Sequence, residues 1–444
     1  MPLKNRQSYY ILLGLHLVMG ILFLNNLVGK IITLIITIAA ITDIILNSNK
    51  KERVLFWVVY FISAEVFFRM TSSLVSWEMI KYVSALLFFI GILSESKTPT
   101  FPPFFFVYVL LLLISIAFTD VPPDASIRMS IVFNLSGPIL LGVAGIYFYG
   151  KEYSLKDIYK SMYFSVLPIL SMLVYLYVRT PDLKEVVFRG SANFATSGGF
   201  GPNQVSTSLG IGFFALGVLI IAKKKFTGLL LLDWLLLVYI FYRALLTFSR
   251  GGLITGVFAF GAFLLFYILT IKKPSLFIGK AIIAILFIAI TVWLYTVYVT
   301  GGMITNRYLG KNASGVQKED ISSGRVDILI TQYDNFLKHP FFGIGVGNGK
   351  YYRMKSDTHV TAASHNEVGR IVEEHGLIGV ISLFMLLFYP LVGIQYKSNL
   401  NKGFVLAFYL IWFLTINHSA MRIALPSVFY GLSLIRISHN EDGF

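Results

Sequence analysis

The feature that most constrains this chain is the recurrence, almost from end to end, of apolar runs long enough to cross a bilayer, for which about 20 residues suffice. A segment in lipid must satisfy its backbone polar groups internally, so each run is expected to be a helix. Only 13% of the residues are charged, against about a quarter in soluble domains. The polar surface that a water-soluble fold needs is therefore missing, and we expect an all-α integral membrane protein.

The length of the runs predicts about 12–14 transmembrane helices. Two polar segments interrupt them, and the second is longer than the usual structureless connection, so we expect it to be a large external loop that contains short helices and a function. The predicted organisation is transmembrane helices over 1–178, an external loop over 179–203, transmembrane helices over 204–299, the large external loop over 300–375 and transmembrane helices over 376–444.

Two stretches of the large loop have the character of helices. The sequence "GRVDILITQYDNFLKHP" has helical periodicity and is expected to stop before Pro340. The sequence "HNEVGRIVEEHG" is expected to form a second helix that starts at His365 and runs to Gly376, where the next apolar run begins.

The charge distribution predicts the orientation. Lys and Arg outnumber Asp and Glu by 37 to 22, which gives a net charge of +15. They gather in short loops such as "NKKER", "AKKKF" and "IKKPS", and these loops alternate with less basic ones as the positive-inside rule expects. With the N-terminus inside, the Lys-rich loops all fall in the cytoplasm. Membrane topology thus explains the charge, and no nucleic acid partner is needed.

Two arginines fall at the outer membrane level in this topology. Arg189 stands beside a Gly- and Ser-rich loop, and Arg250 stands in the turn "FSRGGLITG". Gly251 and Gly252 are expected to permit a turn with positive φ and the close approach of a ligand. A guanidinium group can hold a phosphate through two parallel hydrogen bonds. The alternative is that each arginine only extends its charge to the membrane surface.

His365 falls at the same level. A neutral imidazole can accept a proton from an attacking hydroxyl near pH 7. On a helix that starts at His365, Gly369 and Glu373 would share its face and Arg370 would not. Glu373 could orient the ring or merely be solvated, and we expect the second.

Neither a nucleotide nor a metal is indicated by the loops. The run "GIGVGNG" lacks the Lys-Ser/Thr pair and the strand-turn-helix context of a phosphate loop. The loops also show no convincing cluster of His and carboxylates at metal-ligand spacing. We therefore expect arginines, and neither a metal nor another cofactor, to neutralise a phosphorylated substrate.

Four segments in order resemble the O-antigen ligase/polymerase family of bacterial envelope glycosyltransferases. They are "FRGSANFATSGGFGPNQ", "FSRGG", "SSGRVDILITQYDNFLKHPFFGIGVGNGKYY" and "SHNEVGRIVEEHGLIGVISLF". His365 and Gly376 meet the family's pattern of His, ten residues, then Gly. Arg250 meets its Arg with an aliphatic residue four positions on, although Ile254 stands where Leu is usual. The stretch that holds Arg325, His339 and Pro340 matches the family's large external loop.

The resemblance implies a membrane glycosyltransferase C type fold, in the bacterial inner membrane with its active site on the periplasmic face. It implies a glycan donor on undecaprenyl pyrophosphate and inversion without a metal. Arg189 and Arg250 would bind the pyrophosphate, and His365 would deprotonate the acceptor hydroxyl. Further candidates for substrate binding are Arg325, Asn203 and Arg370. Expected partners are the lipid-linked donor, a glycan or lipid A core acceptor and membrane lipid, with a chain-length regulator as a candidate.

The motifs leave the acceptor open. We favour an O-antigen or exopolysaccharide polymerase, because polymerases vary with each polysaccharide locus. The main alternative is an O-antigen ligase that transfers polysaccharide to lipid A core, and a protein-glycosylating ligase is a third.

A polysaccharide flippase or transporter is a function of a different class. It should have paired halves and polar groups near the bilayer midplane. Asp43, Glu65 with Arg69, and Asp233 are candidates for such groups, but Glu65 and Arg69 are expected to neutralise each other. The long external insert and the lack of a repeat argue against transport.

Overall fold

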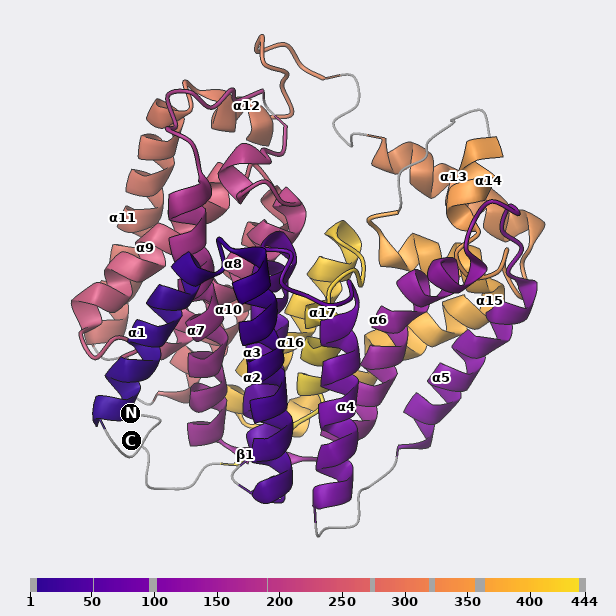
Figure 1. Cartoon of the computed structure of the whole chain (residues 1–444), viewed down its shortest axis with the longest axis horizontal. Coiled ribbons are helices and arrows are strands. Elements are labelled where there is room, and N and C mark those ends of the chain that lie inside the picture. Colours follow the sequence, from indigo (N-terminus) through magenta and orange to yellow (C-terminus); the bar gives the residue numbers. More distant parts are fainter. Residues whose placement is uncertain are drawn as a thin grey trace.

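The computed structural model describes residues 6–50, 52–95, 102–189, 191–271, 276–318, 324–355 and 364–438. Within these ranges helices make up nearly all of the regular secondary structure (Figure 1). The strands found there are β1 (Glu152–Ser154) and β2 (Arg436–Ser438), which pair in parallel. The prediction of an all-α fold is confirmed.

Eight helices of the described chain are long and apolar enough to cross a membrane. They are α2 (Asn26–Leu46), α6 (Ile127–Phe148), α7 (Leu155–Arg179), α8 (Pro202–Ile221), α10 (Arg250–Thr270), α11 (Leu276–Val299), α15 (Glu367–Phe388) and α16 (Asn399–His418).

Other helices of the bundle are shorter or carry more charge. They are α1 (Arg6–Leu22), α3 (Arg53–Met70), α4 (Met79–Ser94), α5 (Pro103–Ile114), which the 3-10 turn η1 (Ser115–Phe118) extends, α9 (Leu230–Leu246) and the short α17 (Leu425–Leu432).

The bundle has a centre and a periphery. The apolar window of α8 is 94% buried within the chain, whereas that of α11 is 11% buried, so α11 offers most of its surface to lipid. At the centre, α8 packs on α10 with almost no side chain between them. A Cβ atom on Gly210 would lie 2.2 Å from the carbonyl oxygen of Gly252, and one on Gly256 would lie 2.2 Å from that of Gly210. Small residues permit this approach of membrane helices, and it fixes where α10 begins.

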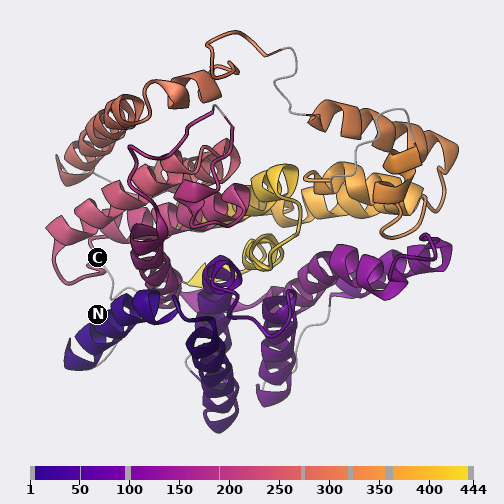
Figure 2. The same ribbon diagram turned by 45° about the horizontal axis from the view of Figure 1, so that its top comes forward.

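The two ends of the bundle differ. The start of α1 lies at the same end as β1, and the short helices α12 (Met303–Tyr308), α13 (Arg325–Lys338) and α14 (Gly349–Lys355) lie at the opposite end (Figure 1). We call this opposite end the loop end. Seen with the loop end turned forward, α11 and α12 lie on one side and α13 to α15 on the other (Figure 2). The predicted helix before Pro340 is confirmed as α13.

The second predicted helix begins later than expected. Asn366 is the N-cap of α15, and its side chain accepts a hydrogen bond of 2.9 Å from the backbone N–H of Gly369. Asparagine is among the preferred N-cap residues, so the helix begins at Glu367 and His365 lies outside it. The expectation that His365 starts the helix and shares a face with Gly369 and Glu373 is therefore wrong.

Gly376 divides α15 into a polar and an apolar half. Its backbone has φ 60° and ψ −140°, outside the helical region. The N–H of Leu377 donates instead to the carbonyl of Pro340 at 2.7 Å. A Cβ atom on Gly376 would lie 2.6 Å from that same carbonyl oxygen, so both the conformation and the contact require glycine. This accounts physically for the glycine that the family pattern places after the histidine.

Candidate active site

Arg250 is the first residue of α10, and the packing around it fixes its position. Positive φ in this turn falls on Phe248, at 56°, and not on the two glycines as the sequence analysis expected. A Cβ atom on Gly251 would lie 2.4 Å from the ring of His418, and one on Gly252 would lie 2.1 Å from the backbone nitrogen of Thr207. The glycines therefore let the first turn of α10 contact α8 and α16. The N-terminus of a helix favours an anion beside it.

The first external loop meets the same turn. The hydroxyl of Ser249 donates to the side-chain oxygen of Asn203 at 2.8 Å, which ties the start of α8 to the residue before Arg250. The ring of Phe188 stacks on that of Phe248, with 5.1 Å between their centroids. Arg189, which follows Phe188 and is exposed, is thereby placed close to the turn that carries Arg250.

Two further arginines join Arg250. Arg307 of α12 donates from Nε to the carbonyl of Phe248 at 3.0 Å. Burial and the neighbouring charges of Arg250 and Arg325 lower the pKa of Arg307. Burial and the charge of Arg250 likewise lower the pKa of Arg325. We call Arg250, Arg307 and Arg325 the arginine cluster.

The arginine cluster has no counter-charge in the described part of the chain. No Asp or Glu there forms an ion pair with any of the three guanidinium groups. Their mutual repulsion is therefore uncompensated, and an anion that carries two or more negative charges would be stabilised between them. In the same residues, no three His, Asp or Glu side chains gather in a way that could hold a metal ion.

His365 lies next to this cluster and is held by both of its neighbours. The carbonyl of Ser364 accepts a hydrogen bond of 2.9 Å from Arg422, and the side chain of Asn366 donates to that of Asn417 at 3.3 Å. Partial loss of hydration, followed by the charges of Arg325 and Arg422, lowers the pKa of His365 below its usual 6.5. The ring is consequently neutral at pH 7 and able to accept a proton.

Arg370 differs from the other candidate residues. It is buried, and its guanidinium group pairs with Glu374 at 2.5 Å and with Glu367. Because these glutamates already neutralise its charge, Arg370 is not a member of the arginine cluster.

Glu373 is also buried, and the expectation that it is solvated is wrong. It accepts from Asn335 at 2.7 Å and pairs with Arg353 at 3.4 Å. The buried polar half of α15 thereby holds α13 and α14 in place.

Three residues of this region were missed by the sequence analysis. Arg307, His418 and Arg422 each lie at or just beyond the end of an apolar run, in "TNRY" and "TINHSAMRI". A charged or titratable residue at such a boundary was a usable signal, since it falls at the same membrane level as Arg250. His418 contributes to the packing of α16 on α8, because its Nε2 lies 3.0 Å from the hydroxyl of Thr207.

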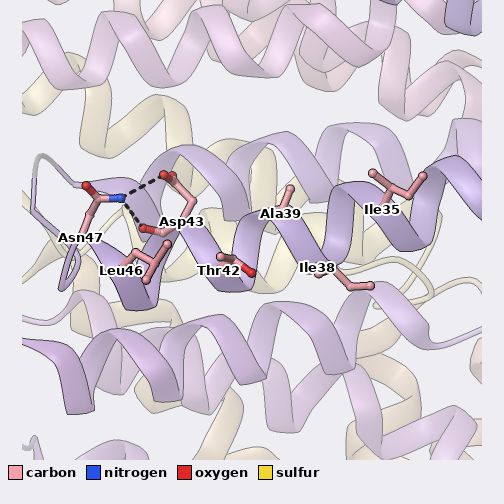
Figure 3. A pocket seen from close by; sticks show the side chains of 7 residues that line it. All are labelled: Ile35, Ile38, Ala39, Thr42, Asp43, Leu46 and Asn47. Atoms are coloured by element: carbon pink, nitrogen blue, oxygen red, sulfur yellow. Dashed lines mark hydrogen bonds between the residues drawn. The ribbon is translucent and has the colours of Figure 1, made fainter.

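A hollow on the outer side of α2, of about 490 Å³, offers no comparable chemistry (Figure 3). Its lining is mainly aliphatic, and Asp43 is its one carboxylate. That carboxylate already accepts from Asn47 at 3.2 Å and from Trp57 at 2.9 Å, and it pairs with Arg53.

The other polar groups proposed for a transport path are also occupied. Glu65 and Arg69 form a buried ion pair of 2.6 Å, as expected. Asp233 accepts from the backbone N–H groups of Phe226 and Thr227 at 2.8 and 2.7 Å. These groups stabilise the bundle and its connections.

The fold and the site define a class: a multi-pass membrane protein with a cluster of arginines and a neutral imidazole at one end of its bundle. Residues 235–384 match a family model described as O-Antigen ligase. This match supports the O-antigen ligase/polymerase family, and the matched segment includes Arg250, Arg325 and His365. No curated protein matches the chain.

Proposed function

We propose that this chain is an inverting, metal-independent glycosyltransferase that moves a glycan from undecaprenyl pyrophosphate to an acceptor hydroxyl. The match to the family model supports a membrane enzyme of the ligase or polymerase type. One observation carries the finer proposal: the arginine cluster has no carboxylate partner among the described residues, and a neutral histidine lies beside it.

The arginine cluster would bind the diphosphate of the donor, and Arg189 would add a fourth cationic group from its exposed loop. The guanidinium fork matches two phosphate oxygens at once. Negative charge grows on the diphosphate as the bond to the sugar breaks, so fixed positive groups stabilise the transition state more than the bound donor.

His365 would act as the general base. The acceptor oxygen attacks the anomeric carbon from the face opposite the diphosphate, while its proton passes to the neutral ring of His365. The bond between the anomeric carbon and the diphosphate oxygen breaks with its electron pair on that oxygen. Undecaprenyl pyrophosphate leaves, and this single displacement inverts the anomeric configuration.

The proposed setting is the bacterial inner membrane, with the loop end on the periplasmic face. The turn between α2 and α3, which carries the basic "NKKER" sequence, lies at the opposite end (Figure 1). This distribution follows the positive-inside rule. The polyprenyl tail would lie along the apolar helices while the sugars remain in water at the loop end.

His365→Ala tests this proposal. Because His365 is exposed, we expect normal insertion but a loss of glycan transfer of about 10²-fold or more, the usual contribution of a general base. The measurement is glycan chain length in a deletion strain complemented with the variant. His339→Ala is the matched control, because His339 is an exposed histidine in the same insert. Normal glycans from the His365 variant would refute the role of the base.

The acceptor is decided by a separate measurement. We favour a polymerase, with the ligase as the alternative. Mass analysis of the glycans of a deletion strain distinguishes them: a single repeat unit on the acceptor indicates a lost polymerase, and long chains left on the lipid carrier indicate a lost ligase.

A further inference from the structure

The helix α13 turns most of its apolar side chains away from the rest of the protein. The residues that it buries are mainly polar: Ile328, Thr331, Gln332 and Asn335. They face α15, where Asn335 donates to Glu373 at 2.7 Å. Its large apolar side chains that are exposed are Val326, Leu329, Ile330, Tyr333 and Leu337. An exposed apolar surface of this kind marks a contact with something outside the chain.

The exposed residues of α13 separate into two sides. One side is a stripe with a spacing of three or four residues, which we call the α13 stripe: Val326, Ile330, Tyr333 and Leu337. The other side is charged and also exposed: Asp327, Asp334 and Lys338. At 3.6 residues per turn, the α13 stripe lies opposite the face that packs on α15, and the charged side adjoins it. This division is typical of a helix that lies in a membrane interface.

The end of α13 lies at the level where α15 becomes apolar. The carbonyl of Pro340, two residues beyond α13, accepts a hydrogen bond of 2.7 Å from Leu377, the first residue of the apolar half of α15. With 14 residues, α13 is too short to cross a bilayer, which takes about 20. It runs largely across the direction of α3 and α4 (Figure 1). A helix in this position lies along a membrane surface.

Two phenylalanines connect the α13 stripe to the membrane helices. Phe341 and Phe342 follow α13 and are exposed, and the ring of Phe342 stacks on that of Phe118 in η1, with 4.9 Å between their centroids. From there the exposed apolar surface continues along α5 and α15, with Leu110, Ile114, Leu377, Ile381 and Phe384. The α13 stripe is therefore continuous with the surface that these two helices present to lipid.

We propose that α13 docks on the bilayer surface at the loop end, with the α13 stripe inserted where headgroups meet acyl chains and the charged side in water. The occupant is lipid because the α13 stripe continues a lipid-facing surface. The charged side holds two aspartates and one lysine, so burial of apolar area, and not attraction to anionic headgroups, supplies the affinity. Because α13 begins with Arg325, docking holds that arginine at headgroup level, and this consequence alone rests on the proposed function.

The chain contains no cysteine, so a single substitution gives a unique site for a fluorescent label. Tyr333→Cys places the label on the α13 stripe, and Asp334→Cys, the next residue and also exposed, is the matched control on the charged side. The full chain is reconstituted in vesicles of phosphatidylethanolamine and phosphatidylglycerol with brominated acyl chains, which quench a label that reaches them. We expect quenching at position 333 to be at least about twofold stronger than at position 334, and quenching by iodide in the water to show the reverse order.

Leu337→Cys and Lys338→Cys form a second pair of the same design, should either member of the first fail to fold. Equal quenching by the brominated lipid at both positions of a pair would overturn the docking of α13. Discs that hold one copy of the chain each test the other occupant. If the stripe label is shielded from iodide only where copies share a bilayer, and brominated lipid does not quench it, a second copy covers the stripe and the inference fails. These readouts do not involve glycan transfer, so their failure leaves the proposed function standing.

Discussion

Two groups of arginines lie at the loop end, and they differ in their partners. Arg353 and Arg370 are buried against glutamates. The arginine cluster of Arg250, Arg307 and Arg325 has no carboxylate partner in the described chain, and its members act on one another through repulsion. The residue type is the same in both groups, so the available counter-charge, and not the arginine itself, separates the structural group from the one that we propose to bind a ligand.

The energetics of the two groups have opposite signs. Removing a guanidinium group from water costs several kcal/mol of free energy. A well-placed buried carboxylate offsets this cost, and loss of either partner leaves the other charge buried without compensation. The paired group therefore contributes to folding as a unit. The arginine cluster brings like charges together without a carboxylate partner among the described residues, which lowers stability, and the proposed anion would relieve this repulsion. Local costs of this kind are expected where a site is prepared for a ligand.

The largest effect is expected from the paired group. Arg370→Ala leaves Glu367 and Glu374 buried without their partner, which should lower the free energy of unfolding by about 3–5 kcal/mol. Thermal unfolding in detergent measures this loss. The triple variant Arg370→Met, Glu367→Gln, Glu374→Gln should recover part of it, because no uncompensated charge remains. If the Arg370→Ala protein had normal stability but did not transfer glycan, Arg370 would be a substrate-binding residue, and the two groups of arginines would not differ in function.

The arginine cluster should respond in the opposite way. Arg250→Ala removes one stabilising charge from the leaving diphosphate, so we expect transfer to fall by about 10²–10³-fold, as for the loss of a donor in other electrostatic sites. Thermal stability should be unchanged or slightly higher, because repulsion is relieved. Arg436→Ala, an exposed arginine in β2, is the control. A marked loss of stability in Arg250→Ala would show that the cluster is structural after all.

A smaller effect separates charge from geometry. Arg250→Lys keeps the positive charge but replaces the planar fork by a single ammonium group, which cannot bind two phosphate oxygens in the same way. We expect an intermediate rate, about tenfold or more below the wild type, with the loss seen mainly in the KM for the lipid-linked donor. Wild-type kinetics in this variant would exclude bidentate binding by Arg250.

The sequence predicted the outline of this molecule and part of its site. Apolar runs predicted the membrane helices, and the periodicity before Pro340 predicted α13. The topology also placed Arg250 and His365 at one membrane level. These features depend on the local pattern of apolar residues and on the alternation of basic and less basic loops, and both can be read along the sequence.

The partners of each charge were harder to predict, for two different reasons. Glu367 and Glu374 stand three and four residues from Arg370, so helical spacing alone predicts that they can pair with it. The contact between Arg422 and Ser364 joins residues 58 positions apart, and no local pattern predicts it. Asn366 is the N-cap of α15, so the helix begins at Glu367 and His365 precedes it.

The smallest effect concerns the charge that the arginine cluster exerts on the base. His365 must be neutral to accept a proton, so transfer should fall as the pH decreases through its lowered pKa. Arg325→Gln removes one of the two charges that lower this pKa. The acid limb of the pH–rate profile should therefore shift to higher pH in this variant. The variant should lose more rate at pH values below the pKa of His365 than at pH values above it.

The matched control for this shift is Lys338→Gln, which removes an exposed charge at the other end of the same helix. If only the Arg325 variant shifts the profile, the cluster and the base act on one another at close range, and the same guanidinium groups that hold the diphosphate also keep the imidazole ready to accept a proton. If neither variant shifts it, a group other than His365 sets the acid limb, and the unpaired cluster would have to be explained by anion binding alone.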